Sequence, residues 1–145
     1  MLKSQCSAGI LIMGNFLQVS TKGHYGLALM AHLAGKFKSG KFISLKEIGD
    51  KENISSGYLE EIAAMLKKTN LITSRKGKSG GYKLNENPQR IKILDIVEAL
   101  EGPLMLVNCL GTDKNFICAN KNCASKKIWR KIQNSLYDKL KKIKL

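Results

Sequence analysis

Apolar residues recur at helical spacing along most of the chain. Residues 21–34 are apolar on nearly every side, which predicts a helix buried against several neighbours. Ser20 or Thr21 can cap its start. Further along, Ser44 precedes Glu47 by three residues. This is the spacing of a capping box, so a short helix of about two turns is expected there.

A second helix is expected after a turn of a few residues. Ser55 can cap it, and four apolar residues then fall on one face at positions i, i+3, i+4 and i+7. These residues are Leu59, Ile62, Ala63 and Leu66. Two helices joined by a short turn, the second of them amphipathic, form the pattern of a helix-turn-helix.

Two short strands are expected next, over residues 71–75 and 81–84, joined by a glycine-rich basic tip. The glycines allow positive φ and close approach of the backbone to a neighbour, and the cations supply charge. These residues are Gly77, Gly80, Gly81, Arg75, Lys76 and Lys78. Such a hairpin can lie along a phosphate backbone or enter a minor groove.

The last third of the chain predicts two helices around a loop. Residues 93–100 carry a helical apolar repeat, which Gly102 and Pro103 end. From about Ser125 a long helix shows a heptad-like seam. The seam consists of Trp129, Ile132, Leu136, Leu140 and Ile143. A single helix cannot bury such a seam, so we expect it to pair with the same helix, or the first helix, of a second copy.

Length and pattern together indicate one compact domain with an appended helix. The chain has 145 residues, of which 43% are hydrophobic, enough for a core but little for an elaborate enzyme. We expect a loose extension over residues 1–17, in which Met13 is a candidate translation start. A winged helix-turn-helix DNA-binding domain over 18–102 and a cysteine-rich loop with a dimerisation helix over 103–145 follow. The expected fold is mostly α with a small β-hairpin wing.

Net charge indicates the class of partner. The chain has 25 Lys and Arg against 11 Asp and Glu, a net charge of +14, which suits a polyanion such as double-stranded DNA. No apolar run approaches the roughly 20 residues that span a bilayer, and no signal peptide is recognisable. We therefore expect a cytoplasmic protein with no membrane partner. No catalytic constellation is visible, so neither enzyme activity nor a small-molecule substrate is expected.

The cysteines indicate a metal or redox function. In a cytoplasmic protein, clustered thiols are metal ligands or redox sensors more often than structural disulfides. Cys109, Cys118 and Cys123 fall in the aperiodic loop, and their spacing is not that of a zinc knuckle. Three thiolates suit iron-sulfur ligation. Unligated buried thiols, a thiol switch and zinc remain the alternatives.

Five segments, in their order and spacing, resemble the IscR/NsrR/CymR type of bacterial winged-helix transcription regulators. The resemblance covers about residues 18–143. It implies a homodimer, a recognition helix in the major groove, a wing in the minor groove and, in many members, an iron-sulfur cluster on three cysteines. For the cluster, 2Fe-2S is favoured over 4Fe-4S. The segments are STKGHYGL, SLKEIGDKENISSGYLEEI, SRKGKSGGYKL, ILDIVEALEGPL and the three cysteines before the Trp-bearing helix.

The resemblance also implies which residues contact DNA. Ser55, Tyr58 and Glu60 fall at major-groove positions, where a carboxylate can accept a hydrogen bond from a cytosine amino group. The basic and glycine residues of the hairpin tip fall at the backbone or the narrow minor groove. In a purely structural interpretation, Ser55 is only a cap, Tyr58 is core and the hairpin is only surface.

The fourth cluster ligand departs from the family pattern. Members resembling IscR have a histidine three residues after the last cysteine, where this chain has Lys126. A protonated lysine has no lone pair to donate. Aligned on Gly26, His24 falls where members resembling NsrR place a carboxylate ligand from the other subunit. We therefore expect His24 to be the fourth ligand, ahead of Asp113, Cys6 or a small exogenous ligand. The alternative role of His24 is a phosphate contact, and we expect His32 in the core.

The sequence thus predicts a homodimeric DNA-binding transcription regulator of repressor type. It would sense iron-sulfur status, redox state or nitric oxide through an iron-sulfur cluster. One alternative is a cluster-free regulator of cysteine or sulfur metabolism that acts through a protein partner. An alternative from a different class is an iron-sulfur electron carrier.

Overall fold

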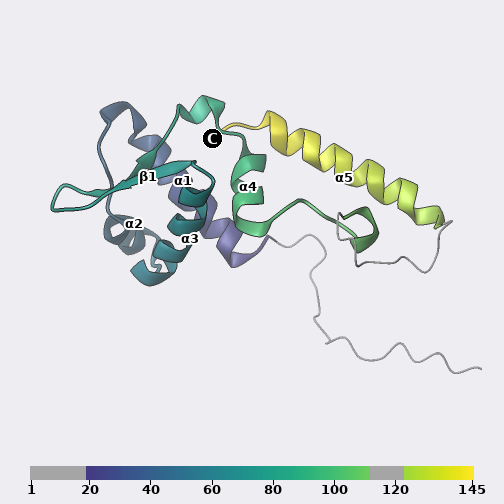
Figure 1. Cartoon of the computed structure of the whole chain (residues 1–145), viewed down its shortest axis with the longest axis horizontal. Coiled ribbons are helices and arrows are strands. Elements are labelled where there is room, and N and C mark those ends of the chain that lie inside the picture. Colours follow the sequence, from purple (N-terminus) through teal and green to yellow (C-terminus); the bar gives the residue numbers. More distant parts are fainter. Residues whose placement is uncertain (1–18, 112–122) are drawn as a thin grey trace, which may run out of the picture.

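A computed structural model describes residues 19–111 and 123–145, and within these ranges five α-helices accompany one two-stranded antiparallel sheet (Figure 1). This is the mostly α architecture with a hairpin that the sequence predicts. The helices are α1 (Thr21–Gly35), α2 (Leu45–Glu52), α3 (Ser56–Lys68), α4 (Ile93–Glu101) and α5 (Ala124–Lys142), and the strands are β1 (Ile72–Arg75) and β2 (Gly81–Leu84). Short 3-10 helices are η1 (Phe37–Ser39), η2 (Pro88–Arg90) and η3 (Asn108–Leu110).

The core lies where α1, α3 and α4 meet, and α2 and the hairpin close its edges. The predicted apolar face of α3 is confirmed: Leu59, Ile62, Ala63 and Leu66 are all fully buried. The expectation that α1 has several neighbours is confirmed, because it packs on α3, α4 and β2. Its outer face is uncovered, and Leu27 there is 38% exposed.

Serine caps begin the first three helices. The side chains of Ser20, Ser44 and Ser55 accept hydrogen bonds from backbone N–H groups three residues ahead, at 3.0, 3.2 and 3.3 Å. Each bond satisfies one of the free donors at a helix start. Among these, Ser20 rather than Thr21 caps α1.

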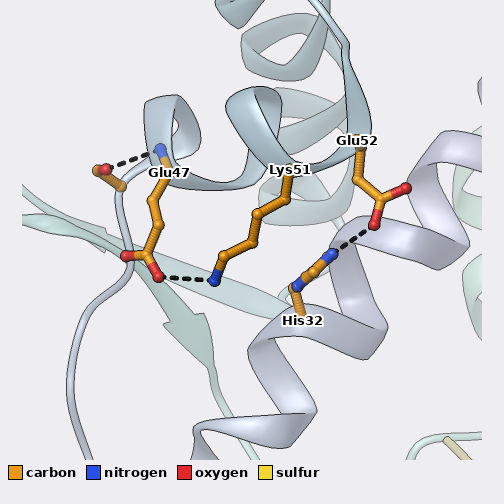
Figure 2. A network of polar contacts seen from close by, with 5 residues as sticks. His32, Glu47, Lys51 and Glu52 are labelled. Carbon is orange, nitrogen blue, oxygen red and sulfur yellow. Dashed lines mark hydrogen bonds and ion pairs between the residues drawn. The ribbon is translucent and has the colours of Figure 1, made fainter.

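The capping box at the start of α2 is only half formed (Figure 2). Ser44 accepts from the Glu47 amide, but the Glu47 carboxylate accepts from Lys51 Nζ at 3.0 Å, one turn further along the helix. This hydrogen bond to Lys51 lowers the pKa of the Glu47 carboxyl. The sequence allowed both partners for Glu47, and the carboxylate pairs with the (i, i+4) ammonium.

A side-chain contact joins α1 to the end of α2. His32 Nε2 and Glu52 Oε1 are 2.6 Å apart (Figure 2). The expectation that His32 is a core residue is wrong, because about a quarter of its side chain is exposed at this junction. Its polar ring nitrogen is satisfied by a carboxylate at the protein surface rather than inside the core.

The turn between α2 and α3 depends on one glycine. Asn53 ends α2 with a φ of 55°, and the chain then folds back so that the Ile54 carbonyl oxygen lies against Gly49. A Cβ atom on Gly49 would lie only 2.6 Å from that oxygen. The angle between the two helices therefore requires a residue without a side chain at position 49.

α5 differs from its predicted bounds at both ends. It begins at Ala124 after Cys123, so Ser125 is not its N-cap residue, and it ends at Lys142. Ile143 therefore does not continue the seam as predicted, because its carbonyl accepts from the Ile93 amide at 3.0 Å in an extended conformation. Within the residues placed by the structure, no helix has the length and apolar character needed to cross a membrane.

We predict that Gly49→Ala lowers the free energy of unfolding by about 1–3 kcal/mol, because the new methyl group meets backbone that cannot rotate away. Gly35→Ala is the matched control, since a Cβ atom there meets nothing within 4 Å at the end of α1. The control should be neutral or stabilise by up to about 1 kcal/mol. Urea unfolding of both variants tests this, and equal stability of the two would contradict the assigned role of Gly49.

Candidate nucleic-acid interface and cysteine segment

The outward side of α3 is acidic in its first half. Glu60 and Glu61 are exposed, and the first basic residue of the helix is Lys67. The Ser55 side chain accepts from the Tyr58 amide at 3.3 Å. Since a hydroxyl in this role uses only an acceptor lone pair, its proton can still be donated to a base or a phosphate. Ser55 and Glu60 thus lie at the exposed start of α3, and base readout by them remains a prediction.

Tyr58 has a structural role at the same helix start. Its half-buried ring packs against the core and lies edge-on to Tyr25 of α1, with ring centroids 6.2 Å apart. The exposed His24 ring is tilted against Tyr25 at 5.1 Å. The aromatic contacts therefore connect the start of α1 to the start of α3, and a DNA contact by Tyr58 remains a prediction.

The hairpin is anchored to the segment that leads into α2. Ile43 lies on the free edge of β2, and its amide and carbonyl both bond Tyr82 across a single bridge, at 2.9 and 2.8 Å. Gly81 has a φ of 137°, and a Cβ atom there would lie 2.3 Å from the Ile43 carbonyl oxygen. Gly81 is thus required by the fold itself. Gly80 is likewise confined by the Arg75 carbonyl, which would lie 2.2 Å from its Cβ atom.

The cationic side chains of the hairpin differ in how many contacts hold them. Lys76 and Lys78 are exposed at the tip beside Gly77. Arg75 is held, because its Nη2 donates to the Ser79 carbonyl at 2.8 Å and its guanidinium lies 4.3 Å from the centroid of the Phe42 ring. Across residues 19–111 and 123–145, the ion pairs are His32 with Glu52 and Lys51 with Glu47. The described structure therefore places no carboxylate against the hairpin cations.

The positive charge of the chain is divided between two regions. Residues 19–102 carry fourteen Lys and Arg against nine Asp and Glu, a net charge of +5, whereas residues 123–145 carry eight against one, a net charge of +7. The hairpin and α5 extend toward opposite ends of the molecule (Figure 1). Net charge alone therefore overstates the charge of the predicted DNA-binding domain.

Two of the three clustered cysteines lie in the described segments. Cys109 is in η3 and Cys123 directly precedes α5; both thiols are free and partly exposed, and Cys118 lies outside the described residues. The Cys123 Sγ and Ser125 Oγ atoms are 3.2 Å apart. This hydrogen bond, followed by those from backbone N–H groups at the helix start, lowers the pKa of the Cys123 thiol. The fraction of thiolate, the form that binds metals, is therefore raised at Cys123.

The predicted fourth ligand is not joined to these cysteines within one chain. Over the described parts of the structure, no group of three or more His, Cys, Asp or Glu side chains could hold a metal ion. The start of α1 does lie against the end of α4, where Ser20 Oγ donates to the Glu101 carboxylate. From that end of α4 the chain continues to η3, which contains Cys109. Ligation by His24 remains a prediction.

The seam of α5 is partly covered by its own chain. Trp129, Leu136 and Leu140 are half-buried, and the Gln133 side chain accepts from the Leu106 amide at 3.0 Å. Ile132 is 42% exposed. The sequence pattern missed Ile128, which is 60% exposed one turn before Ile132 on the same side. The apolar side of α5 therefore extends beyond the part that this chain covers.

Comparison with known proteins identifies the type of molecule. The Rrf2 family, described as an iron-dependent transcriptional regulator, matches residues 19–145. The transcriptional regulator CymR of Bacillus subtilis is 35% identical over 124 residues, which cover 86% of this chain and 83% of that protein. The solved structure of CymR, the global cysteine regulator of B. subtilis, matches with a TM-score of 0.75 at 33% identity, covering 88% of this chain and 92% of the other. The structure of IscR from T. potens matches at 0.69 and 37% identity, covering 88% and 82%.

We predict that Cys123 of the reduced, metal-free protein reacts with iodoacetamide as a thiol whose pKa lies below the usual value of about 8.5. A lowered pKa means more thiolate at neutral pH, so the pH midpoint of its labelling rate should fall below that of a free cysteine. Ser125→Ala should raise the midpoint, whereas Ser135→Ala, further along α5, should not. Peptide mapping by mass spectrometry gives the rate at Cys123. An unchanged midpoint in Ser125→Ala would contradict the assignment.

Proposed function

This chain belongs to the Rrf2 family of transcriptional regulators. We therefore propose that it acts in the cytoplasm as a homodimer and binds promoter DNA through α3 and the hairpin. Its relatives are transcription regulators and not enzymes, so an electron carrier is set aside. The proposal is carried by one observation. An amphipathic helix with a buried apolar face and an exposed, capped start lies beside an anchored hairpin whose cations face no carboxylate within the described residues.

The hairpin would supply most of the affinity for DNA, and α3 would supply most of the sequence specificity. Phosphate contacts by Lys and Arg supply most of the salt-dependent, sequence-independent affinity. The hairpin tip holds the exposed Lys76 and Lys78, whereas the cations of α3, Lys67 and Lys68, lie in its last turn. The exposed start of α3 carries Glu60 and Glu61, which repel phosphates. A carboxylate in a DNA-reading helix favours cytosine and weakens binding elsewhere. We therefore assign base discrimination to α3 and phosphate contact to the hairpin.

We propose that α5 forms the dimer contact through its uncovered apolar side. Ile128 and Ile132 are exposed on this side, next to the half-covered seam residues Trp129, Leu136 and Leu140. A second copy would bury them, as in other paired helices with such a seam. Ile143 is not part of this proposed surface, since it has left the helix.

We further propose that Cys109, Cys118 and Cys123 hold an iron-sulfur cluster. The donor set fits, since thiolates are the usual ligands of such clusters and the pKa of the Cys123 thiol is lowered. When bound, the cluster would supply a centre that responds to redox state or nitric oxide. Because Cys123 begins α5 and Cys109 lies in η3, which contacts α5, ligation would fix the start of the dimer helix.

A cluster-free regulator is the second candidate. The similarity to CymR, the global cysteine regulator of B. subtilis, favours this alternative. In that case the cysteines of this chain would act as thiols, and the signal would reach the protein through another molecule. The two candidates share the DNA-binding function and differ only in the signal.

We predict that Lys76→Ala and Lys78→Ala each weaken binding to specific and random duplexes alike and lower the log-log salt slope by about one. Glu60→Ala should instead strengthen binding to random duplex and reduce the preference for the specific site, since it removes both a repulsion and a possible base contact. Lys127→Ala, in the first turn of α5, is the matched control and should change neither. Fluorescence anisotropy across a salt series measures this. Unchanged slopes in both hairpin variants would contradict the assignment.

We predict that the protein purified without oxygen is coloured and contains iron and acid-labile sulfide. Cys118→Ala should lose both, Cys6→Ala should retain both, and His24→Ala should retain iron but shift the absorption bands and make the cluster more labile. A colourless, iron-free protein that still binds DNA would support the cluster-free candidate. An unchanged His24→Ala spectrum would exclude His24 as the fourth ligand.

A further inference from the structure

Phe42 is a residue outside the hairpin that touches two hairpin cations. It precedes the bridge residue Ile43 and is half-buried. The Arg75 guanidinium carbon lies 4.3 Å from its ring centroid and the Lys83 ammonium lies 4.9 Å from it. Both distances are within the range of cation-π attraction. One aromatic ring thus fixes a cation from each strand of the hairpin.

The strand register explains why both cations reach the same ring. Thr73 pairs with Lys83 and Arg75 with Gly81. Because side chains alternate between faces along a strand, Arg75 and Lys83 lie diagonally on one face of the hairpin. The register of the two strands therefore places two positive charges together on one face of the hairpin, with Arg75 directly before the tip residue Lys76.

Neither Arg75 nor Lys83 has a carboxylate within ion-pair distance among the described residues. Lys83 also lines a hollow of about 440 Å³ that it shares with Lys41. The other lining residues are Leu33, Phe37, Gly40, Leu84 and Asn85, none of which is acidic. Cations gathered without a carboxylate repel one another, and an anion placed between them would relieve that repulsion.

We propose that Arg75 and Lys83 form a phosphate-binding element on one face of the hairpin strands and that Phe42 is its positioning residue. The ligand is the backbone phosphate of the duplex that the hairpin tip contacts, so the inference rests on the proposed DNA binding. Long cationic side chains lose rotamer freedom when they contact DNA. Phe42 holds both in place beforehand, so less of that freedom remains to be lost on binding.

Substitutions can separate the position of these cations from their charge. Lys83→Ala removes a charge and should weaken binding to random-sequence duplex and lower the salt slope by about one. Phe42→Leu keeps both charges and should weaken binding about 3- to 10-fold with the salt slope unchanged. Phe42→Tyr retains the aromatic face and should bind like the original chain. Thermal unfolding of each variant shows whether the fold is retained.

A double-mutant comparison on the full-length protein completes the experiment. Phe42→Leu combined with Lys83→Ala should cost less than the two changes added, because both remove the same contact. Phe42→Leu combined with Lys78→Ala should be additive, since the ring contacts Arg75 and Lys83, whereas Lys78 lies exposed in the tip.

The outcomes distinguish a failure of the positioning role of Phe42 from a failure of DNA binding. Phe42→Leu with unchanged affinity, or additive with Lys83→Ala, would overturn the positioning role while DNA binding by the original chain stood. A loss of affinity in Phe42→Tyr equal to that in a folded Phe42→Leu would also overturn it. If the original chain bound no duplex, the proposed function and this inference would both fail.

Discussion

The burial of the apolar face of α3 is the constraint on which the rest of the molecule depends. Leu59, Ile62 and Leu66 are fully excluded from solvent between α1 and α4, and replacing one such side chain by alanine typically costs about 2–5 kcal/mol. Once this face is fixed inward, Ser55 and Glu60 must face outward. The same packing sets the angle of α2, because the close approach of Gly49 to the Ile54 carbonyl leaves no room for another arrangement.

The net charge of +14 conceals a difference in charge between two neighbouring surfaces, the start of α3 and the hairpin. The helix proposed to read DNA is acidic at its exposed start, whereas the hairpin beside it presents cations that meet no carboxylate in the described parts of the chain. This combination favours sequence-specific over non-specific DNA binding, because the repulsion between the α3 carboxylates and phosphates must be offset by the correct base contact. The larger share of the net positive charge, +7, lies on residues 123–145, which extend away from the hairpin (Figure 1).

The start of α5 links the proposed sensing and dimer functions through one residue. Cys123 is the last residue before the helix, and the N–H groups of its first turn lower the thiol pKa together with Ser125. Free N–H groups at a helix start favour an anion there. When deprotonated, Cys123 therefore stabilises the first turn of α5. A reaction that removes this charge would weaken the start of the helix proposed to form the dimer contact.

The sequence by itself determined the elements whose signals are local. Serine caps at positions 20, 44 and 55, the spacing from Leu59 to Leu66 and the glycine-rich tip were sufficient to predict the first three helices, the hairpin and a winged helix-turn-helix, because caps, periodicity and turns act within a few residues. The tertiary structure decided what depends on distant neighbours. It turned Glu47 to Lys51, placed His32 at the surface beside Glu52, and ended α5 before Ile143 by pairing the chain end with Ile91 and Ile93. It also brought Phe42 to Arg75 and Lys83, a contact that no local pattern encodes because it depends on the register of one strand against another.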